Sequence, residues 1–178
     1  MERMVMIKDF EDEYRRYRIN GEKAMAQVSD DALNKALGPD DNSIAIIVRH
    51  ISGNLLSRFT DFLTTDGEKD WRNRDSEFSD VTYTRQELDE MWVRAWSVLE
   101  TQFTGLTDED LEKTVSIRGT SLTVHEALCR SLAHTASHIG QIILLAKVLS
   151  GGEWKSLSIP KGMSGTYNQN PTLEKTHK

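Results

Sequence analysis

Four long segments of this 178-residue chain repeat apolar side chains at alternating spacings of three and four residues. This spacing places the apolar residues on one stripe of an α-helix and leaves the rest of the helix surface polar. The segments span approximately residues 4–28, 43–65, 84–103 and 123–150. The pattern therefore predicts an all-α protein in which four long helices pack as a four-helix bundle.

Capping residues predict where three of these helices begin. Thr84 and Thr123 each precede a glutamate by three residues, which is the capping-box pattern. Asn42 or Ser43 is expected to cap the second helix. Gly21 lies in the apolar stripe of the first helix, where glycine costs roughly 1 kcal/mol of helix stability. We expect it to allow the close approach of a neighbouring helix.

Two connections distinguish this predicted bundle from a simple up-and-down arrangement. Residues 68–80 are polar and make a long connection between the second and third helices, which also allows those helices to be parallel. Trp71 and Phe78 are the expected apolar anchors of this ordered loop. Residues 115–123 alternate around Gly119, which predicts a small β-hairpin before the fourth helix.

The chain is expected to divide into one domain and one arm. A length of 178 residues with 38% hydrophobic content suits a single core, which we place in residues 1–152. Residues 153–178 are mostly polar, with Trp154, Leu157 and Ile159 as sparse apolar anchors. We expect this C-terminal arm to dock partly on the bundle or on a second subunit, and then to fray.

Charge and apolar content exclude several classes of partner. The net charge of −6 and the lack of a basic run disfavour binding to nucleic-acid phosphates. The longest unbroken apolar runs have five residues, against the ~20 that span a bilayer. The charged N-terminal segment does not resemble a signal peptide, and a single cysteine excludes an intramolecular disulfide. We therefore expect a cytoplasmic protein that binds neither nucleic acid nor membrane.

Three of the five histidines are candidate metal ligands. His134 and His138 are four residues apart in the predicted fourth helix, so their Cβ atoms lie about 5–6 Å apart on one face. His50 lies in the predicted second helix. One histidine on one helix and a pair on another can build a three-nitrogen site for a divalent metal inside a bundle.

Periodicity leaves the orientation of His50 open. Its side chain projects about 120° from the centre of the apolar stripe, on a polar flank shared with Asn54. This flank predicts a histidine that faces solvent, unless it borders the groove facing the fourth helix. Asn54 and Gln141, one turn from His50 and His138, are candidates for orienting a ligand or substrate. Solvated polar side chains are the plain alternative for both.

Two other residues near the histidine pair are expected to lie outside the site. His125 is nine residues before His134 and points roughly the opposite way, so we expect it at the surface near the helix cap. Cys129 is expected to be a small buried hydrophobic residue rather than a ligand. Ala127 and Ser131 lie on the stripe of the histidine pair, and their small size would leave room for a ligand.

The run from His134 to Gln141, His-x-x-x-His-x-Gly-Gln, together with a histidine early in the second helix, resembles the DinB/YfiT-like bacterial family. The resemblance covers about residues 1–150 and implies a four-helix bundle with a histidine triad that binds a divalent metal. His50, His134 and His138 match the triad positions. The family includes thiol transferases that use bacillithiol or mycothiol, and proteins proposed to be hydrolases.

Two classes of function remain open from the sequence. The first is a metal-dependent enzyme that acts on small molecules, either by transferring a thiol to an electrophilic substrate or by hydrolysis. It would use Zn²⁺ or Ni²⁺ and, for transfer, a low-molecular-weight thiol. The alternative is a non-enzymatic metal-binding protein, of a stress-response or interaction type, whose metal joins two helices. A homodimer is expected for this chain, and a metal-free bundle with incidental histidines is a third alternative.

Overall fold

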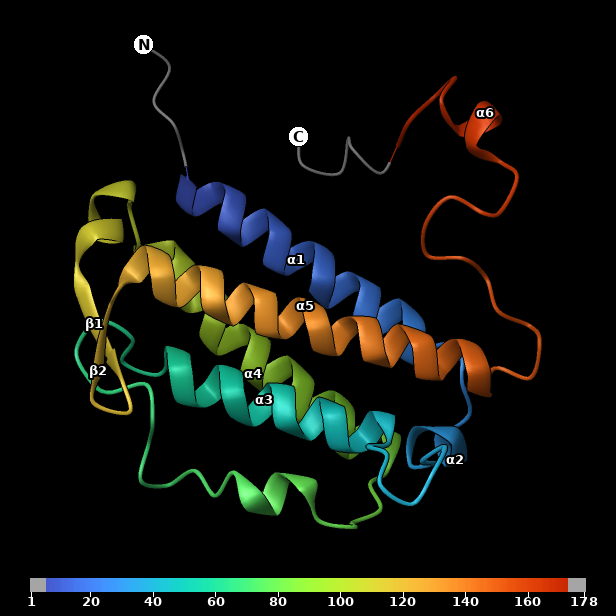
Figure 1. The fold of residues 1–178 in the computed structure, drawn as a ribbon, viewed down its shortest axis with the longest axis horizontal. Coiled ribbons are helices and arrows are strands. Elements are labelled where there is room, and N and C mark those ends of the chain that lie inside the picture. Colours follow the sequence, from blue (N-terminus) through green and yellow to red (C-terminus); the bar gives the residue numbers. More distant parts are fainter. Residues whose placement is uncertain (1–5, 173–178) are drawn as a thin grey trace.

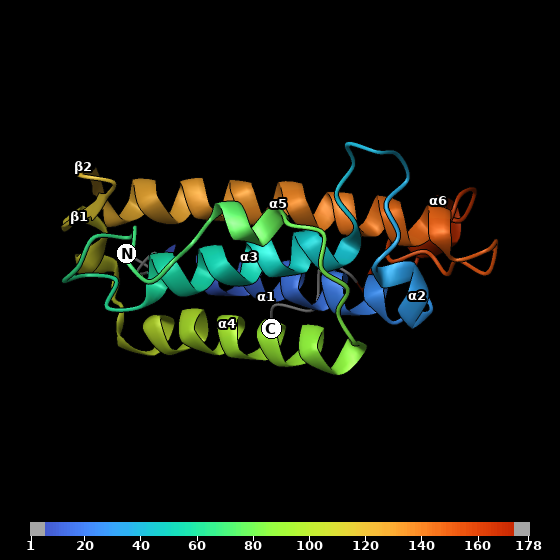
Figure 2. The same cartoon turned by 90° about the horizontal axis from the view of Figure 1, so that it is seen from below.

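The computed structural model describes residues 6–172, and this part of the chain is all-α apart from one short hairpin (Figure 1). The predicted all-α class is therefore confirmed. The long helices lie side by side in both views (Figures 1 and 2) and are α1 (Met6–Met25), α3 (Ile44–Phe59), α4 (Arg85–Gly105) and α5 (Val124–Leu149). The short elements are α2 (Asp30–Leu33), η1 (Asp75–Phe78), η2 (Asp108–Glu112), β1 (Thr114–Ile117), β2 (Thr120–Thr123) and α6 (Ser164–Tyr167).

Local capping chemistry explains where the long helices begin. The hydroxyl of Ser43 accepts a hydrogen bond from the backbone N–H of Ile46, so Ser43 is the cap of α3. Thr84 and Thr123 form complete capping boxes at the starts of α4 and α5, as predicted. These polar side chains satisfy backbone donors that the first helical turn leaves unpaired.

The helix ends differ from the predictions. The first helix was expected to reach residue 28 but ends at Met25, and a turn leads to α2, which the apolar pattern did not reveal. The start expected at Met4 lies outside the described residues. The second helix was expected to reach Thr65 but ends at Phe59, because Thr60 is extended and Asp61 has a left-handed φ of 50°.

Close helix packing occurs at Gly21, as expected. A Cβ atom at this position would lie 3.0 Å from the side chains of Ile139 on α5 and Trp92 on α4, so these side chains would have to shift to admit one. Trp92 and Trp96 are fully buried, and their rings are in contact at a tilt of 53°, with centroids 5.3 Å apart.

Residues 66–80 pass over α3, and we call them the covering segment. Its short helix η1 packs against α3 (Figure 2). Phe78 is half-buried and its ring contacts His50, but Trp71 is 60% exposed, so the prediction that Trp71 anchors this loop is wrong. Polar contacts attach the segment to α3 instead: Arg49 donates to the Ser79 hydroxyl at 3.2 Å, and Glu77 lies 2.8 Å from the ring of His50.

Asp66 fastens the covering segment to the β1–β2 hairpin. The strands pair antiparallel, and their turn places Arg118 and Gly119 at φ values of 54° and 70°. The Asp66 carboxylate accepts hydrogen bonds from the Ser116 hydroxyl at 2.6 Å and from the backbone N–H groups of Arg118 and Gly119 at 2.8 Å. These donors hold the pKa of Asp66 well below its usual value.

Among the described residues, α5 is the one helix whose length and apolar content would suffice to cross a membrane. Apolar side chains of this helix, including Leu128, Ile139 and Ile142, are fully buried against the other helices. Packing in the core accounts for these residues, whereas Leu144 and Val148 of the same helix are 62% and 56% exposed.

The C-terminal arm begins with contacts to the helices. Trp154 and Leu157 pack against the core, and Gln27 of the α1–α2 turn exchanges two hydrogen bonds with the backbone of Lys155. Ile159 is half-buried. The last residues, 173–178, where fraying is expected, lie outside the described residues. The division of the chain at residue 152 stays a prediction.

Candidate metal centre

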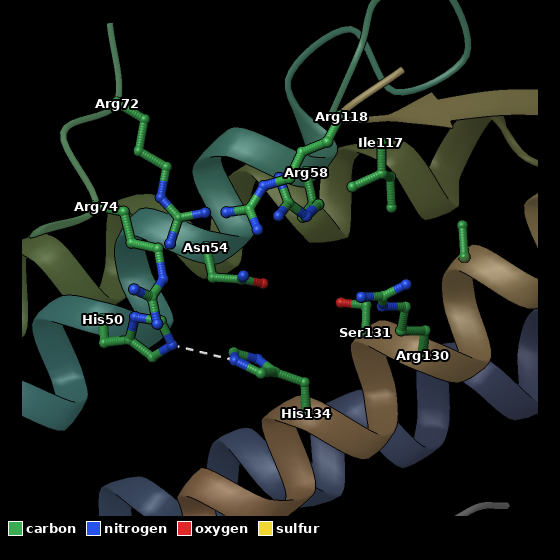
Figure 3. A pocket seen from close by; sticks show the side chains of 11 residues that line it. His50, Asn54, Arg58, Arg72, Arg74, Ile117, Arg118, Arg130, Ser131 and His134 are labelled. Atoms are coloured by element: carbon green, nitrogen blue, oxygen red, sulfur yellow. Dashed lines mark hydrogen bonds between the residues drawn. The ribbon is translucent and has the colours of Figure 1, made fainter. Parts of the chain in front are cut away.

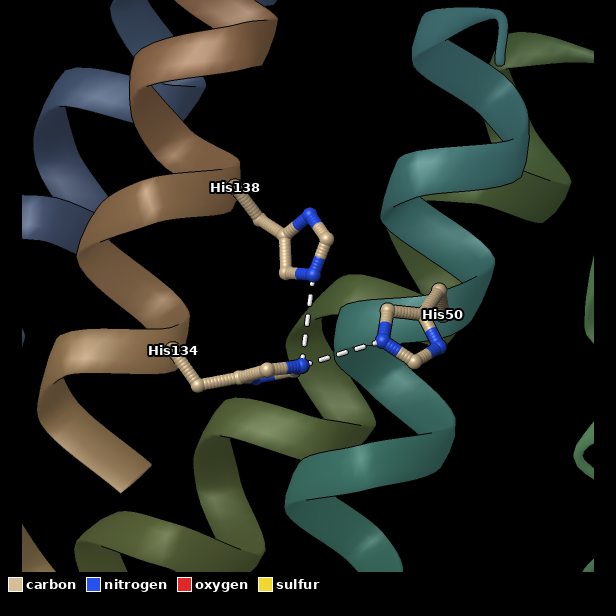
Figure 4. Close-up of side chains that lie close together, drawn as sticks. All are labelled: His50, His134 and His138. Atoms are coloured by element: carbon tan, nitrogen blue, oxygen red, sulfur yellow. Dashed lines mark hydrogen bonds between the residues drawn. The ribbon is translucent and has the colours of Figure 1, made fainter. Parts of the chain in front are cut away.

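The three predicted histidines come together between α3 and α5. His50 of α3 and His134 of α5 line one cavity (Figure 3), and His138 lies one turn further along α5 (Figure 4). The Nε2 atom of His134 is 3.1 Å from that of His50 and 3.2 Å from that of His138. One ring nitrogen from each residue lies within 4.8 Å of the others.

His50 does not face solvent. Its residue exposure is 4%, because the covering segment lies over the polar flank that periodicity identified. Of the two alternatives for His50, the structure shows the one in which this flank borders the groove facing the fourth predicted helix. The Nδ1 atom of His50 is 2.8 Å from Oε2 of Glu77. In the tautomer that donates Nδ1–H to this carboxylate, the Nε2 lone pair faces the other histidines.

Glu77 is a site residue that sequence reasoning missed. It is only 5% exposed, and Arg72 donates to its two oxygens at 2.7 and 3.0 Å. Burial alone would raise the pKa of Glu77, but the hydrogen bonds from His50 and Arg72 outweigh this effect and lower it. The carboxylate therefore stays charged and holds the ring of His50. Glu77 is 27 residues from His50 in a segment without periodicity, so no pattern linked the two.

The second ring is oriented in the same way. Nδ1 of His138 is 2.7 Å from Oε1 of Gln141, so a proton donated there leaves Nε2 of His138 free. Gln141 thus contacts a histidine of the group, as expected if it orients a ligand rather than being only a solvated side chain. Asn54 lines the cavity beside His50 and His134 (Figure 3).

Electrostatics favour neutral imidazoles. Burial, followed by the proximity of His138 and His50, lowers the pKa of His134 to about 4. Burial also lowers the pKa of His138, although its hydrogen bond to Gln141 acts in the opposite direction. Neutral imidazole is the form that binds a metal ion. The described residues therefore bring three ring nitrogens to one point, two of them on imidazoles whose pKa is lowered, which fits a divalent metal.

A comparison with known families decides the membership of the chain. A family model described as a protein of unknown function, DUF1572, matches residues 3–163. The chain belongs to the DUF1572 family. No curated protein and no solved structure matches it. The matched range of this DUF1572 protein includes all three histidines and Glu77, and the family description states no activity.

The predictions for His125 and Cys129, which precede the histidine pair of this DUF1572 member, have different outcomes. His125 is exposed and packs its ring against Phe10, outside the site as expected. Cys129 is also exposed, with Sγ 3.6 Å from Nε2 of His125, so the prediction that Cys129 is buried is wrong. The reason is that α5 turns Ala127 and Leu128 inward, which leaves Cys129 on the outer face.

The cavity beside the histidines has a volume of about 170 Å³ (Figure 3). Ala127 and Ser131 form part of its wall, which confirms that small residues leave room next to the pair. Its basic residues are Arg58, Arg72, Arg74, Arg118 and Arg130. These arginines come from α3, the covering segment, the hairpin turn and α5, so the fold gathers residues that are scattered in the sequence. No basic run therefore announces them.

Proposed function

We propose that His50, His134 and His138 hold one divalent metal ion and that this DUF1572 protein is a metal-dependent enzyme acting on small molecules. The single observation that supports this is the convergence of three ring nitrogens, two of them on rings whose other nitrogen is already hydrogen-bonded. Three protein ligands leave a coordination position open, as catalytic zinc sites do, whereas structural sites are closed by four. We also propose that the four long helices form a DinB-like four-helix bundle.

The nature of the donors suggests which metal would bind. Imidazole nitrogens suit Zn²⁺ and Ni²⁺, and within residues 6–172 no carboxylate oxygen belongs to the ligand group. A divalent ion held there supplies a Lewis acid that favours the deprotonated form of a thiol or of water. The reaction we propose is either thiol transfer to an electrophilic small molecule, with a low-molecular-weight thiol as cosubstrate, or hydrolysis.

The protein residues have separate roles in this proposal. Glu77 fixes the tautomer of His50, and Gln141 does the same for His138. The cavity next to His50 and His134 receives the substrate, and Asn54 offers an amide in its wall. Its small volume favours a small molecule over a polymer.

A second candidate function is a non-enzymatic protein in which the metal joins two helices. The observation that favours it is that the ligands come from two helices: His50 lies on α3, and His134 and His138 lie on α5. Such a metal would contribute directly to folding energy, so a chelator would unfold the protein. In the enzyme, the buried apolar core keeps the helices folded after the metal is removed.

The test is metal content and function in matched variants. Protein purified without an affinity tag should contain about one equivalent of divalent metal by elemental analysis. His134→Ala should lose the metal and retain its helical circular dichroism, whereas His125→Ala, an exposed histidine on the same helix, should keep the metal. Equal metal content in both variants would refute the site. A screen of low-molecular-weight thiols with electrophilic substrates, and of ester and amide substrates, then separates transfer from hydrolysis.

A further inference from the structure

We propose that the cavity beside the histidines binds an oxyanion group of the substrate, a carboxylate or a phosphate, through the arginines of its wall. The proposal rests on the function proposed above and adds the chemical class of the substrate. It implies a small molecule with a negative charge at one end and its reacting atom near His50 and His134.

The first observation is the concentration of positive charge. Five of the twelve arginines of this chain line a cavity of about 170 Å³, although the net charge of the protein is −6. None of the described residues that line it is acidic. Gathering like charges around one small space is unfavourable unless an anion compensates them.

The carboxylates behind the wall compensate only part of this charge. Glu77 pairs with Arg72, and Glu68 is shared between Arg58, at 3.3 Å, and Arg118, at 2.8 Å. Two carboxylates therefore serve three arginines. The remaining two, Arg74 and Arg130, contribute further positive charge to the wall.

Neither of the remaining arginines is neutralised in the described part of the chain. The nearest carboxylate to Arg74 is that of Asp75, 3.9 Å away on a fully exposed side chain. Arg130 forms no ion pair with the residues that the structure describes. Both guanidinium groups are therefore available to an anionic ligand.

Arg72 supplies an observation that points directly to a ligand. Its side chain is 2% exposed, and its Nη1 atom is buried without a hydrogen-bond partner among residues 6–172. A buried donor of a charged group that lacks a partner is costly, and an oxyanion would satisfy it. Figure 3 shows the guanidinium groups of Arg72 and Arg130 reaching toward the cavity from opposite sides, with His134 between them.

The size of the cavity limits the ligand. A cavity of about 150 Å³ accommodates a molecule such as benzene, so this one has room for a carboxylate or phosphate and a few carbon atoms. Burial, and then the charge of Arg72, lower the pKa of Arg58. An anion between these two side chains would relieve their mutual repulsion.

The test uses the full chain, stripped of metal and dialysed free of chelator, so that no metal can bind the probe. Inorganic phosphate and malonate are titrated separately by calorimetry at constant ionic strength. We expect saturable binding of at least one of them. Arg130→Gln should weaken it by about tenfold, the effect of losing one charge-assisted hydrogen bond. Arg94→Gln, an exposed arginine of α4 outside the cavity wall, should leave the Kd unchanged.

Two results would overturn the proposal. One is the absence of saturable binding for both probes, and the other is an equal loss of affinity in Arg94→Gln and Arg130→Gln, which indicates unspecific attraction. Circular dichroism checks that each variant is folded. A zinc titration of the same samples without added anion tests the metal site independently. Zinc binding without anion binding refutes only this proposal, and anion binding without zinc binding refutes only the metal site.

Discussion

A Cβ atom added to Gly53 would lie 2.9 Å from the carboxyl carbon of Glu77. Gly53 lies on α3, three residues after His50, so the two positions share a face of the helix. Glycine inside a helix costs about 0.5–1 kcal/mol relative to alanine. At this position it provides the space that lets the Glu77 carboxylate reach His50.

Gly53→Ala should therefore weaken metal binding while leaving the helices intact. The added methyl group displaces Glu77 from His50, and loss of such a supporting contact lowers metal affinity by roughly 10- to 100-fold. Competitive zinc titration measures the effect. Gly140→Ala is the matched control, because a Cβ there meets nothing within 4 Å. Equal zinc affinities of the two variants would contradict the role assigned to Gly53.

Glu77→Gln should reduce zinc affinity by a similar factor of roughly 10- to 100-fold. The neutral amide lacks the negative charge of the carboxylate that fixes the ring of His50. Nitrogen NMR of the imidazole should show a loss of preference for the Nδ1–H tautomer of His50. The exposed residue Glu112 provides a control, since Glu112→Gln changes the same charge without reaching the site. An unchanged tautomer in Glu77→Gln would argue against this role.

The metal-free protein should lose stability as the pH falls from about 6.5 toward about 4. An unfolded histidine takes up a proton near pH 6.5, whereas His134 in the folded protein has a pKa of about 4. Unfolding therefore consumes a proton in this window, and acid favours the unfolded state. Urea unfolding at several pH values measures how the free energy of unfolding depends on pH. This dependence should be weaker for His134→Gln, while His125→Gln should keep the pH dependence of the original protein.

Asp66→Asn should loosen the covering segment from the hairpin turn. The aspartate pKa is held low by the Ser116 hydroxyl and by backbone N–H groups, so its stabilising effect is present at neutral pH and is lost as acid protonates it. Hydrogen exchange should become faster in residues 66–80 and 116–119 but not in α1 or α4. Asp70→Asn, an exposed neighbour, should exchange like the original protein; uniform acceleration throughout the chain would contradict the prediction.

Truncation after Gly152 should lower the melting temperature. It removes Trp154 and Leu157, which pack against the core, and the backbone partner of Gln27. Size-exclusion chromatography with light scattering shows whether the arm also contributes to the expected homodimer. If the melting temperature and the oligomeric state both stay unchanged, the arm has no structural role.

The parts of the fold that the sequence predicts well depend on neighbouring residues. The caps at Ser43, Thr84 and Thr123 need only side chains within one turn, and these predictions are confirmed. The end of α3 depends on distant contacts instead, because the Ser57 hydroxyl donates to the backbone of Gly67 after the chain has turned back. No local pattern contains that information.

The site divides in the same way. His134 and His138 are neighbours by helix geometry alone, so their proximity follows from their spacing. The burial of His50 depends on the covering segment, whose path is set by contacts such as Asp66 with the hairpin. The arginine cluster joins residues from several elements, and each appears isolated in the sequence. Gly53 was the one local sign of Glu77, since a glycine inside a helix and close to His50 indicates that another group approaches the helix there.

His50 and His134 are 84 residues apart in the chain, yet their Nε2 atoms are separated by 3.1 Å. Sliding α3 along α5 by a single helical turn, about 5.4 Å, would separate them completely. Cobalt(II) in this position would absorb visible light according to how many nitrogens surround it. Its spectrum would therefore report the alignment of two helices during unfolding, while circular dichroism counts only how much helix remains.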